Sequence, residues 1–411
     1  MAKLSSSNGK KANVPKLRFP EFTEEWEEIS FSNLFDFLPN NTITRANLSN
    51  NGAIRNIHYG DVLIKFGSVL SIRSDDIPFI KNTDTVNNNV FLKNGDIVIA
   101  DTAEDETVGK VTEIFDIYTE KVVSGLHTIP CRPKKNFAPK FLGYYMNSPA
   151  YHYQLFPLMQ GVKVLSISKS NIVGTVIHYP DILQQTKITN LLSLIDKKIS
   201  VQRQLVEALK KYKRGSLSAL FPKKREITPQ YRFAGFTKPW EQRKLGDCVE
   251  FLDTMRKPLK EGDREKGQYP YYGASGIVDY VSDYIFDEEL VLLSEDGANI
   301  TDRNYPVCFL ASGKYWVNNH AHVLKTNKEN ENNFICNSLE RMDFTPYNSG
   351  MAMPKLNKEV CQKIPLSCPS FAEQKEIGDY FRSLDTLITL HQHKYDILLS
   401  LKNALLQQMF I

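Results

Sequence analysis

Two long stretches of this chain share one pattern of apolar and polar positions. Between residues 185 and 221, apolar residues recur mostly in steps of three and four, at Ile188, Leu192, Ile195, Ile199, Val206 and Leu209. Such steps follow a narrow stripe along an α-helix, so the pattern predicts a helix that pairs with another helix along a coiled-coil seam. Gln202 takes the polar position of this seam. A polar residue there sets the register of a helix pair at some cost in stability.

The second stretch, residues 374–410, repeats the first at a displacement of 189 residues without a gap. Asp196 then corresponds to Asp385, and the polar Gln202 corresponds to His391. The matching seam positions of the second stretch include Ile377, Leu384 and Ile388. Each helix would be up to about 55 Å long at 1.5 Å per residue. We therefore expect two similar helices that pair in antiparallel fashion and hold the globular parts of the chain apart.

A second repeat opens each half of the chain. The segment LRFPEFTEEWE at residues 17–27 returns as YRFAGFTKPWE at residues 231–241. A repeat of this length indicates a duplicated domain rather than a solenoid of small units. The predicted divisions are a disordered tail (1–14), a first domain (15–182), a central helix (183–222), a linker (223–230), a second domain (231–370) and a terminal helix (371–411).

Between each opening motif and its helix, the pattern changes to short apolar runs. In the first half these runs predict strands at 61–64, 68–72, 122–132 and 175–179, a hairpin around Asn94–Gly95 within 90–100, a helix over 140–158, and a short helix after Ser168. In the second half they predict an aromatic loop at 268–276, strands at 284–293, 307–310 and 322–324, and a loop at 295–299. The two halves differ most in their middles. Their borders correspond, and the loop at 348–350 matches the loop at Gly161.

The charge and composition of the chain limit its partners. With 411 residues the chain has room for two or three domains, and its net charge is only +4. Binding to nucleic acid would therefore depend on local patches or on a partner. None of the six cysteines lies in a CxxC pair, which is typical of reduced thiols in a cytosolic protein. No apolar run reaches the roughly 18 residues of a membrane span, and the first residues lack the apolar core of a signal peptide.

Motifs for catalysis are missing or incomplete. There is no GxxxxGK[ST] phosphate loop. The nearest match to the Asn-Pro-Pro-aromatic tetrad of base methyltransferases is at 147–151, where a turn between helices is the simpler interpretation. Asp181 followed by Asp196 resembles a metal-nuclease pattern on paper, but Asp196 lies on the long helix and its counterpart Asp385 lacks the required Lys. His320 and His322 have no further ligands at zinc spacing. We expect no catalytic residues and no metal site, with both Asp residues facing solvent or a partner helix.

The loops are rich in residue types that contact DNA. Asn pairs bidentately with adenine, Arg and Lys pair with guanine or phosphate, and aromatic residues stack on bases. Taken singly each candidate is also explained as ordinary loop polarity, and His58 equally by core packing. The candidate contacts are His58, Tyr59, Arg73, Asn87, Asn88, Lys110, Lys163, Lys169, Arg256, Lys257, Tyr271, Tyr272, Ser275, Asn299, Arg303, Asn318, Asn319, His320 and Lys355.

The layout resembles the specificity subunits of type I restriction-modification systems. The resemblance rests on the duplicated R-F-x-x-F-x-x-x-W-E opening, the closing helices with Q-x-x-I…D…I, and the phrases at 57–61 and 269–274. It implies an α+β fold in which two similar mixed α/β target recognition domains are separated by two long antiparallel coiled-coil helices, with a pseudo-two-fold repeat. It also implies helices that dock two modification (methyltransferase) subunits, through Ile188, Leu192, Ile195, Asp196, Ile199, Gln202, Ile377, Leu384, Asp385, Ile388 and His391.

The function expected from this resemblance is non-catalytic reading of a bipartite, asymmetric double-stranded DNA target. The chain would carry no cofactor. S-adenosylmethionine, ATP and Mg²⁺ would be bound by the modification subunits and by restriction subunits in the full cytoplasmic complex, which has no membrane role. Two other classes stay open at this point. One is a stand-alone DNA nuclease or methyltransferase, and the other is a coiled-coil scaffold that binds only protein.

Overall fold

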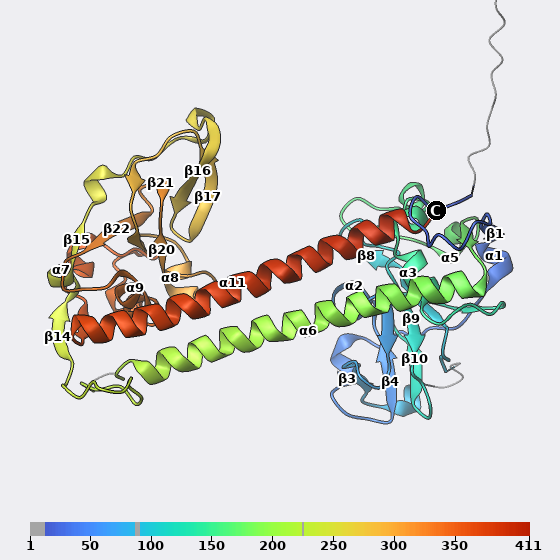
Figure 1. The fold of residues 1–411 in the computed structure, drawn as a ribbon. Helices are drawn as coiled ribbons and strands as arrows, with labels where there is room; N and C mark the ends of the chain where they lie inside the picture. The colour runs from blue at the N-terminus through green and yellow to red at the C-terminus, as the bar shows by residue number, and fades with distance from the viewer. Residues whose placement is uncertain (1–12, 87–90, 224–225) are drawn as a thin grey trace, which may run out of the picture. The chain divides into compact units, whose positions relative to one another are not determined.

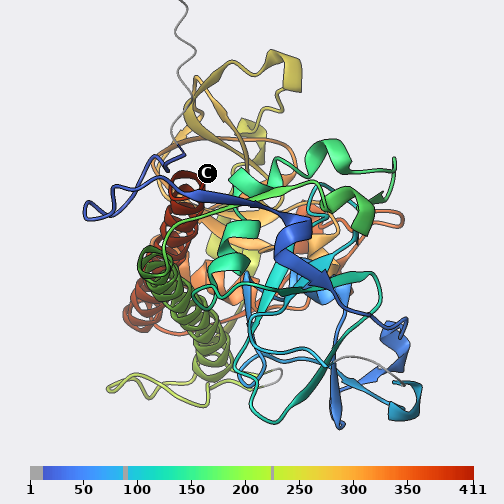
Figure 2. The same ribbon diagram turned by 90° about the vertical axis from the view of Figure 1, so that its right-hand side faces the viewer.

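The chain folds into two compact units. The computed structural model describes residues 13–86, 91–223 and 226–411, and its fold is shown in Figures 1 and 2. The first unit comprises Met1–Val201 with Tyr395–Ile411, and the second comprises Gln202–Lys394. Each long helix therefore belongs partly to both units. The expected contacts Asn87 and Asn88, and most of the expected tail, lie outside the described residues.

The first unit is built from short strands and short helices ahead of one long helix. Its elements are β1 (Glu27–Ser30), α1 (Phe31–Leu34), β2 (Phe35–Phe37), η1 (Arg45–Asn47), β3 (Leu48–Ser49), β4 (Ile54–Ile57), α2 (Tyr59–Ile64), β5 (Val69–Ser71), β6 (Phe79–Ile80), η2 (Thr83–Thr85), β7 (Ile97–Ala100), β8 (Thr102–Ala103), β9 (Val111–Phe115), β10 (Lys121–Ser124), β11 (Thr128–Pro133), α3 (Phe141–Met146), α4 (Pro149–His152), η3 (Phe156–Leu158), β12 (Leu165–Ser166), α5 (Lys169–Ile172), β13 (Val176–Tyr179) and α6 (Ile182–Leu220).

Two mixed sheets form the body of the first unit. One has the strand order β2-β11-β7-β9-β5 and the other β10-β4-β6-β3, and each contains a single parallel pair. Two further antiparallel pairs, β1 with β13 and β8 with β12, tie the borders of the unit together. The strand β7 reads Ile-Val-Ile-Ala and is buried on both faces, as its uninterrupted apolar sequence requires.

The second unit repeats this plan with a different middle. Its elements are β14 (Glu241–Lys244), α7 (Leu245–Cys248), β15 (Val249–Phe251), η4 (Asp253–Met255), η5 (Glu261–Asp263), β16 (Lys266–Gly273), β17 (Gly276–Val281), β18 (Phe286–Asp287), β19 (Leu290–Ser294), α8 (Asn299–Asp302), β20 (Cys308–Ala311), β21 (Lys314–Val317), β22 (Ala321–Thr326), α9 (Asn332–Glu340), η6 (Thr345–Tyr347), α10 (Lys358–Cys361), β23 (Pro365–Cys368) and α11 (Phe371–Gln408).

The sheets of the second unit match the first at their centre and differ around it. The order β15-β22-β19 repeats β2-β11-β7, and β14 with β23 repeats β1 with β13. The other sheet, β17-β16-β21-β18, is dominated by a long hairpin that has no counterpart in the first unit. The duplicated borders and the divergent middles inferred from the sequence are both confirmed.

An aromatic cluster in each unit explains why the opening motif recurs. In the first unit Trp26 packs against Phe141 and against Phe410, with ring centroids 6.2 Å apart in both pairs. In the second unit Trp240 packs against Phe334 and Phe221 at 5.7 and 5.9 Å. Each opening Trp therefore anchors the last residues of the long helix that closes the other half of the sequence.

The long helices pair in antiparallel fashion within each unit. Figures 1 and 2 show the last turns of α11 beside the first half of α6 in the first unit. Ile188 and Leu192 share a buried core there with Leu406, and Asp196 pairs with Lys402 at 2.6 Å. In the second unit Lys213 pairs with Asp385, also at 2.6 Å. A displacement of 189 residues converts one ion pair into the other, as a pseudo-two-fold arrangement requires. Of the two alternatives for these Asp residues, the structure shows that they bind the paired helix.

The polar seam position also behaves as expected. Gln202 is buried, and its amide nitrogen lies 2.7 Å from Nδ1 of His391 and 3.0 Å from the His391 carbonyl oxygen. These two residues correspond to one another in the repeat, at the displacement of 189 residues. A shift of one turn would leave the buried Gln202 and the half-buried His391 without these partners, which penalises other registers.

Several local predictions for the first unit are wrong. Residues 61–64 form part of helix α2 and not a strand, because the side chain of His58 accepts a hydrogen bond from Gly60 N and caps the helix. The turn at Asn94 exists, but the Asn94 side chain bonds the backbone of Ile117, and β7 pairs with β9 and β11 instead of forming a local hairpin. The strand at 122–132 is two strands, β10 and β11, in different sheets.

The remaining errors have similar causes. The helix predicted over 140–158 is three short pieces, because Asn147 turns its amide to the backbone of Val111 and Pro149 begins a new turn. The segment 268–276 is mostly strand β16, where Tyr271 and Tyr272 pair with β17 and β21 despite the nearby Gly and Pro residues. The strand at 284–293 is likewise split into β18 and β19, and the loop at 295–299 leads into α8.

Candidate nucleic-acid interface

In the first unit, the candidate residues before α2 are held by internal contacts. His58 is buried, and burial, followed by the charge of Arg45, lowers the pKa of its imidazole. Arg45 forms a bidentate pair with Asp61 at 2.8 and 2.9 Å. The Tyr59 ring lies against His58 in a tilted arrangement and packs edge-on against His127, with centroids 4.6 and 5.3 Å apart. His58 is therefore a structural cap, whereas Tyr59 and His127 reach the surface.

In the second unit, several candidate residues take part in a charge network that is largely buried. His322 Nδ1 lies 2.7 Å from Asp253 Oδ2, and Arg256 Nη1 donates to Glu295 at 2.7 Å. Burial pushes the pKa of Asp253 upward, but the hydrogen bond from His322 and the charges of His322 and Arg256 outweigh it, so the net shift is downward. Lys355 also pairs with Glu295, at 3.3 Å. Arg256 and Lys355 therefore already pair with a carboxylate of their own unit, and a DNA phosphate would have to compete with that carboxylate.

Several other candidates are also occupied inside their own unit. Tyr271 is buried and its hydroxyl accepts from Leu259 N. Lys110 donates to the Leu63 carbonyl at 2.5 Å, and burial lowers the pKa of its ammonium. The remaining occupied candidates are Asn299, bonded to Ser294 and Pro306, Asn318, which accepts from His320 N, Arg303, paired with Glu340, and Tyr272, packed on Phe309 and Tyr315.

The candidates that stay exposed are fewer. Arg73 lies over the ring of Tyr118 and near Glu120. Lys163 lies in the loop before β12, and Lys169 begins α5. Ser275 is at the turn of the β16–β17 hairpin, and Lys257, Asn319 and His320 are on loops of the second unit.

Sequence reasoning missed one residue that the repeat makes equivalent to His320. The backbone nitrogen of Asp101 donates to the carbonyl oxygen of His127 at 3.1 Å, and that of Glu295 donates to His320 at 2.8 Å. Each imidazole also lies next to a carboxylate, His127 at 3.3 Å from Asp101 and His320 at 2.8 Å from Asp296. Alignment of the strands that follow the two histidines, TIPC and AHVL, could have revealed the pair.

Most of the side chains expected to dock subunits are packed inside the chain. Ile188, Leu192, Ile377 and Leu384 are buried in the cores of their own units, and Ile195 is buried as well. Ile199, Ile388 and His391 are half-buried on the seam side of the helices, beside the buried Gln202. Their positions explain the pairing of the helices, and their part in docking other subunits stays a prediction.

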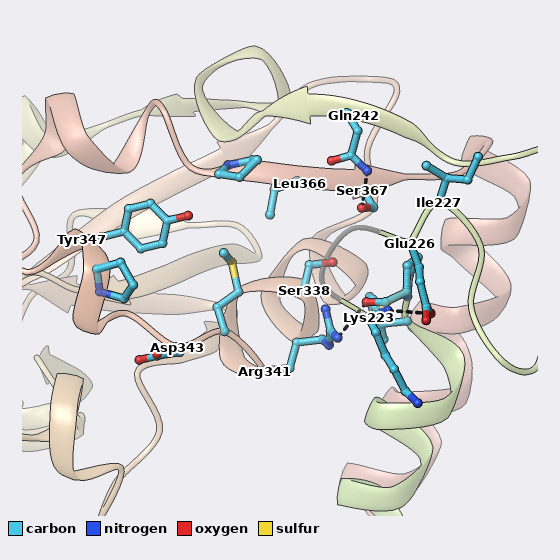
Figure 3. Close-up of a pocket in the computed structure, with 15 residues that line it drawn as sticks. Lys223, Glu226, Ile227, Gln242, Ser338, Arg341, Asp343, Tyr347, Leu366 and Ser367 are labelled. Atoms are coloured by element: carbon cyan, nitrogen blue, oxygen red, sulfur yellow. Dashed lines mark hydrogen bonds between the residues drawn. The ribbon is translucent and has the colours of Figure 1, made fainter.

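A pocket of about 610 Å³ in the second unit lies where α6 ends. Figure 3 shows Lys223 and Glu226 at one end of this pocket and Asp343 and Tyr347 at the other. Arg341 donates to the Pro222 carbonyl at 3.0 Å and covers the ring of Phe221, and burial lowers the pKa of its guanidinium. These contacts satisfy the carboxyl end of the helix, so the pocket is accounted for by the anchoring of α6.

Among the described residues, no group of three or more His, Cys, Asp or Glu side chains is arranged to hold a metal ion. No helix in the described part of the chain is long and apolar enough to cross a membrane. The six cysteines are all buried as free thiols.

Comparison with known proteins gives one consistent answer. Residues 237–399 match the family model described as a type I restriction modification DNA specificity domain. A putative type I restriction enzyme specificity subunit from Haemophilus influenzae is 37% identical over 150 residues, which are 36% of this chain and 38% of that protein. The putative MjaX specificity subunit from Methanocaldococcus jannaschii is 23% identical over 93% of this chain and 92% of its own length.

Solved structures show the same fold. The S subunit of a type I restriction-modification system from M. genitalium superposes with a TM-score of 0.64 at 16% identity, over 97% of this chain and 99% of that one. A second solved structure, which concerns complex assembly and conformational transition of the type I R-M system, superposes with a TM-score of 0.51 at 15% identity. The match covers 94% of this chain and 97% of that one. The match to the H. influenzae protein covers well under half of either chain, whereas the M. jannaschii match covers nearly all of both. With a duplicated α/β unit and paired helices, the chain is similar over most of its length to type I restriction-modification specificity subunits, and its residues 237–399 match the specificity domain of that family.

Proposed function

We propose that this chain is the DNA-reading subunit of a type I restriction-modification complex. One observation carries the proposal: the two units share the scaffold β2-β11-β7 and β15-β22-β19 but differ in the sheets attached to it. A shared scaffold that carries different sheets supports two recognition domains that have the same framework and bind different DNA sequences. The target would then consist of two different half-sites on one duplex, and the chain itself would perform no catalysis.

The outer faces of the long helices supply the partner surface of this proposal. Three pairs of corresponding apolar residues are exposed there: Ile182 and Phe371, each 47% exposed, Val201 and Leu390, at 56% and 61%, and Tyr212 and Leu401, at 58% and 45%. Each unit carries one member of every pair. Exposed apolar residues on a repeated surface favour binding of two copies of one protein. A methyltransferase subunit that binds S-adenosylmethionine is the partner we propose, with ATP and Mg²⁺ used by further restriction subunits in the cytoplasm.

Methylation mapping of a host that expresses this chain with its methyltransferase tests the reading function. We expect one bipartite motif with two dissimilar halves and a constant gap. Deleting seven residues from α6 and the corresponding seven from α11 removes about two helical turns. The modified bases should then stay the same while the gap shortens. Changed bases at an unchanged gap would contradict the proposed roles of the units and the helices.

Native mass spectrometry of the reconstituted complex tests the docking surface. Val201→Asp or Leu390→Asp alone should remove one methyltransferase copy, and the double variant should remove both. Ile64→Asp is a matched control, because Ile64 is exposed on α2 and lies off the long helices. Loss of both copies with either single variant would show that the two surfaces are not independent.

A further inference from the structure

Each unit carries a small hairpin loop whose tip is apolar and exposed. In the first unit the loop runs from Gln160 to Ser166, and these two residues exchange backbone hydrogen bonds of 3.0 and 2.8 Å. In the second unit Ser349 N donates to the Lys355 carbonyl at 2.8 Å, and the Asn348 side chain accepts from two further backbone nitrogens. The loops correspond at the displacement of 189 residues.

The tips of these loops expose apolar side chains. Val162 is 99% and Val164 49% exposed, and the corresponding Met351 and Met353 are 104% and 60% exposed. Val162 and Met351 are the two most exposed large apolar side chains among the described residues. Fully exposed Val and Met side chains at two equivalent places indicate a binding element.

Glycine at the base makes both loops tight. A Cβ on Gly161 would lie 1.9 Å from the Val164 carbonyl oxygen, and a Cβ on Gly350 would lie 1.8 Å from that of Met353. The backbone on the far side of each tip therefore passes directly against the glycine. Immediately after each loop a buried residue fastens it to the scaffold: Ile167 N donates to Asp101 O at 2.8 Å, and Leu356 N donates to Glu295 O at 2.7 Å. The tips are thus held at one defined place on each unit.

The loops lie beside the two equivalent histidines. Thr102 pairs with Ser166 across the β8–β12 ladder and lies 3.4 Å from His127. In the second unit Asp296, which holds His320, bridges to Lys355 at the end of the loop. The base of each loop therefore lies next to an exposed imidazole, and the tip of the first loop also carries Lys163.

We propose that the two tips are apolar wedges that enter the stacked bases of the DNA, one in each half-site. This inference rests on the proposed function. Val and Met side chains at the end of a narrow, fixed hairpin match the apolar residues that proteins insert between base steps to unstack them. A tip of two side chains is too small for a protein partner, since stable protein interfaces bury about 800 Å² on each side. The element recurs in both units because base stacking is common to both half-sites, whereas the bases are not.

The test uses the reconstituted complex and duplexes that carry 2-aminopurine at successive positions of the mapped target. The fluorescence of 2-aminopurine rises when its stacking is lost. We expect the complex to raise it at one step in each half-site. Val162→Ser with Val164→Ser should abolish the rise only in the half-site read by the first unit and weaken binding roughly tenfold. Met351→Ser with Met353→Ser should do the same in the other half-site.

The chain itself offers the matched control. Grafting the second tip onto the first, as Val162→Met, Lys163→Ala and Val164→Met, keeps the apolar character and should retain both fluorescence and affinity. Unchanged fluorescence and affinity in the Ser variants would overturn the proposal. Loss of methyltransferase from the Ser variants in native mass spectra would also overturn it, by showing a protein contact. A wild-type complex that protects no defined DNA sequence would instead overturn the proposed function.

Discussion

Phe410→Ala is the perturbation that tests most directly how α11 is fastened to the first unit. Phe410 is buried, and its ring lies 6.2, 5.9 and 5.8 Å from the rings of Trp26, Phe141 and Tyr145. Replacing a buried Phe with Ala generally costs about 3–5 kcal/mol, including the cavity that is left. The last residues of the chain can relax more than a core strand can. We therefore expect a loss of about 3 kcal/mol, at the low end of this range.

The assay combines denaturant unfolding with hydrogen exchange measured on peptides from both units. In Phe410→Ala, exchange should rise in β1, α3 and the last turns of α11, because these elements share the cluster. Phe221→Ala is the matched variant, since Phe221 contacts Trp240, Phe334 and Phe381 in the second unit. It should raise exchange around α9 instead.

Leu401→Ala controls for simple loss of an apolar side chain from α11, because Leu401 is exposed. It should change stability by no more than about 0.5 kcal/mol. A loss of less than about 1 kcal/mol for Phe410→Ala would refute the reasoning. So would equal exchange increases in both units for either variant, because the clusters would then not be the separate anchors that the contacts describe.

Three further predictions concern charges and the helix seam. A double-mutant cycle on Asp196 and Lys402 should give a coupling of about 1 kcal/mol that decreases with added salt, since the pair is only partly shielded from water; a coupling that salt leaves unchanged would argue against it. Burial raises the pKa of Glu113 to about 7 from an ordinary 4.5, because the folded protein favours the protonated carboxyl. The stability that the protonated Glu113 contributes is therefore complete below about pH 4.5 and is lost as the pH rises through 7. Unfolding between pH 4 and 8 should show this loss, about 3 kcal/mol at most, and Glu113→Gln should flatten it. Replacing both Gln202 and His391 with Leu should raise the melting temperature while allowing other helix registers, which cross-linking of cysteine pairs across the seam would detect.

Periodicity and repetition in the sequence were enough to predict the paired helices and the duplicated domain. The seam from Ile188 to Leu209 and its copy predicted two paired helices because coiled-coil pairing depends on a local spacing that a sequence displays directly. The recurrence of Trp26 as Trp240 predicted the duplication, because two copies of one fold need the same anchors at the same places.

Local assignments failed where contacts that the apolar pattern does not reveal decided the outcome. The run at 61–64 is apolar enough for a strand, but the His58 cap made it a helix. Asn94–Gly95 turns as predicted, yet β7 pairs with β9 and β11, because the buried ladder of a five-stranded sheet satisfies more backbone groups than a local hairpin does.

The candidate DNA contacts show the same contrast between what the sequence predicts and what the fold decides. The sequence by itself determined that Asn, Lys, Tyr and His residues would crowd the loops, because residue type is local information. Only the tertiary structure decided which of them are available: Arg256 is held by Glu295 and Tyr271 by the backbone of Leu259, whereas His127 and the tips at Val162 and Met351 are exposed. Availability depends on which partners the fold brings within hydrogen-bonding distance, and these two partners lie 12 and 39 residues away along the chain, beyond the reach of a local pattern.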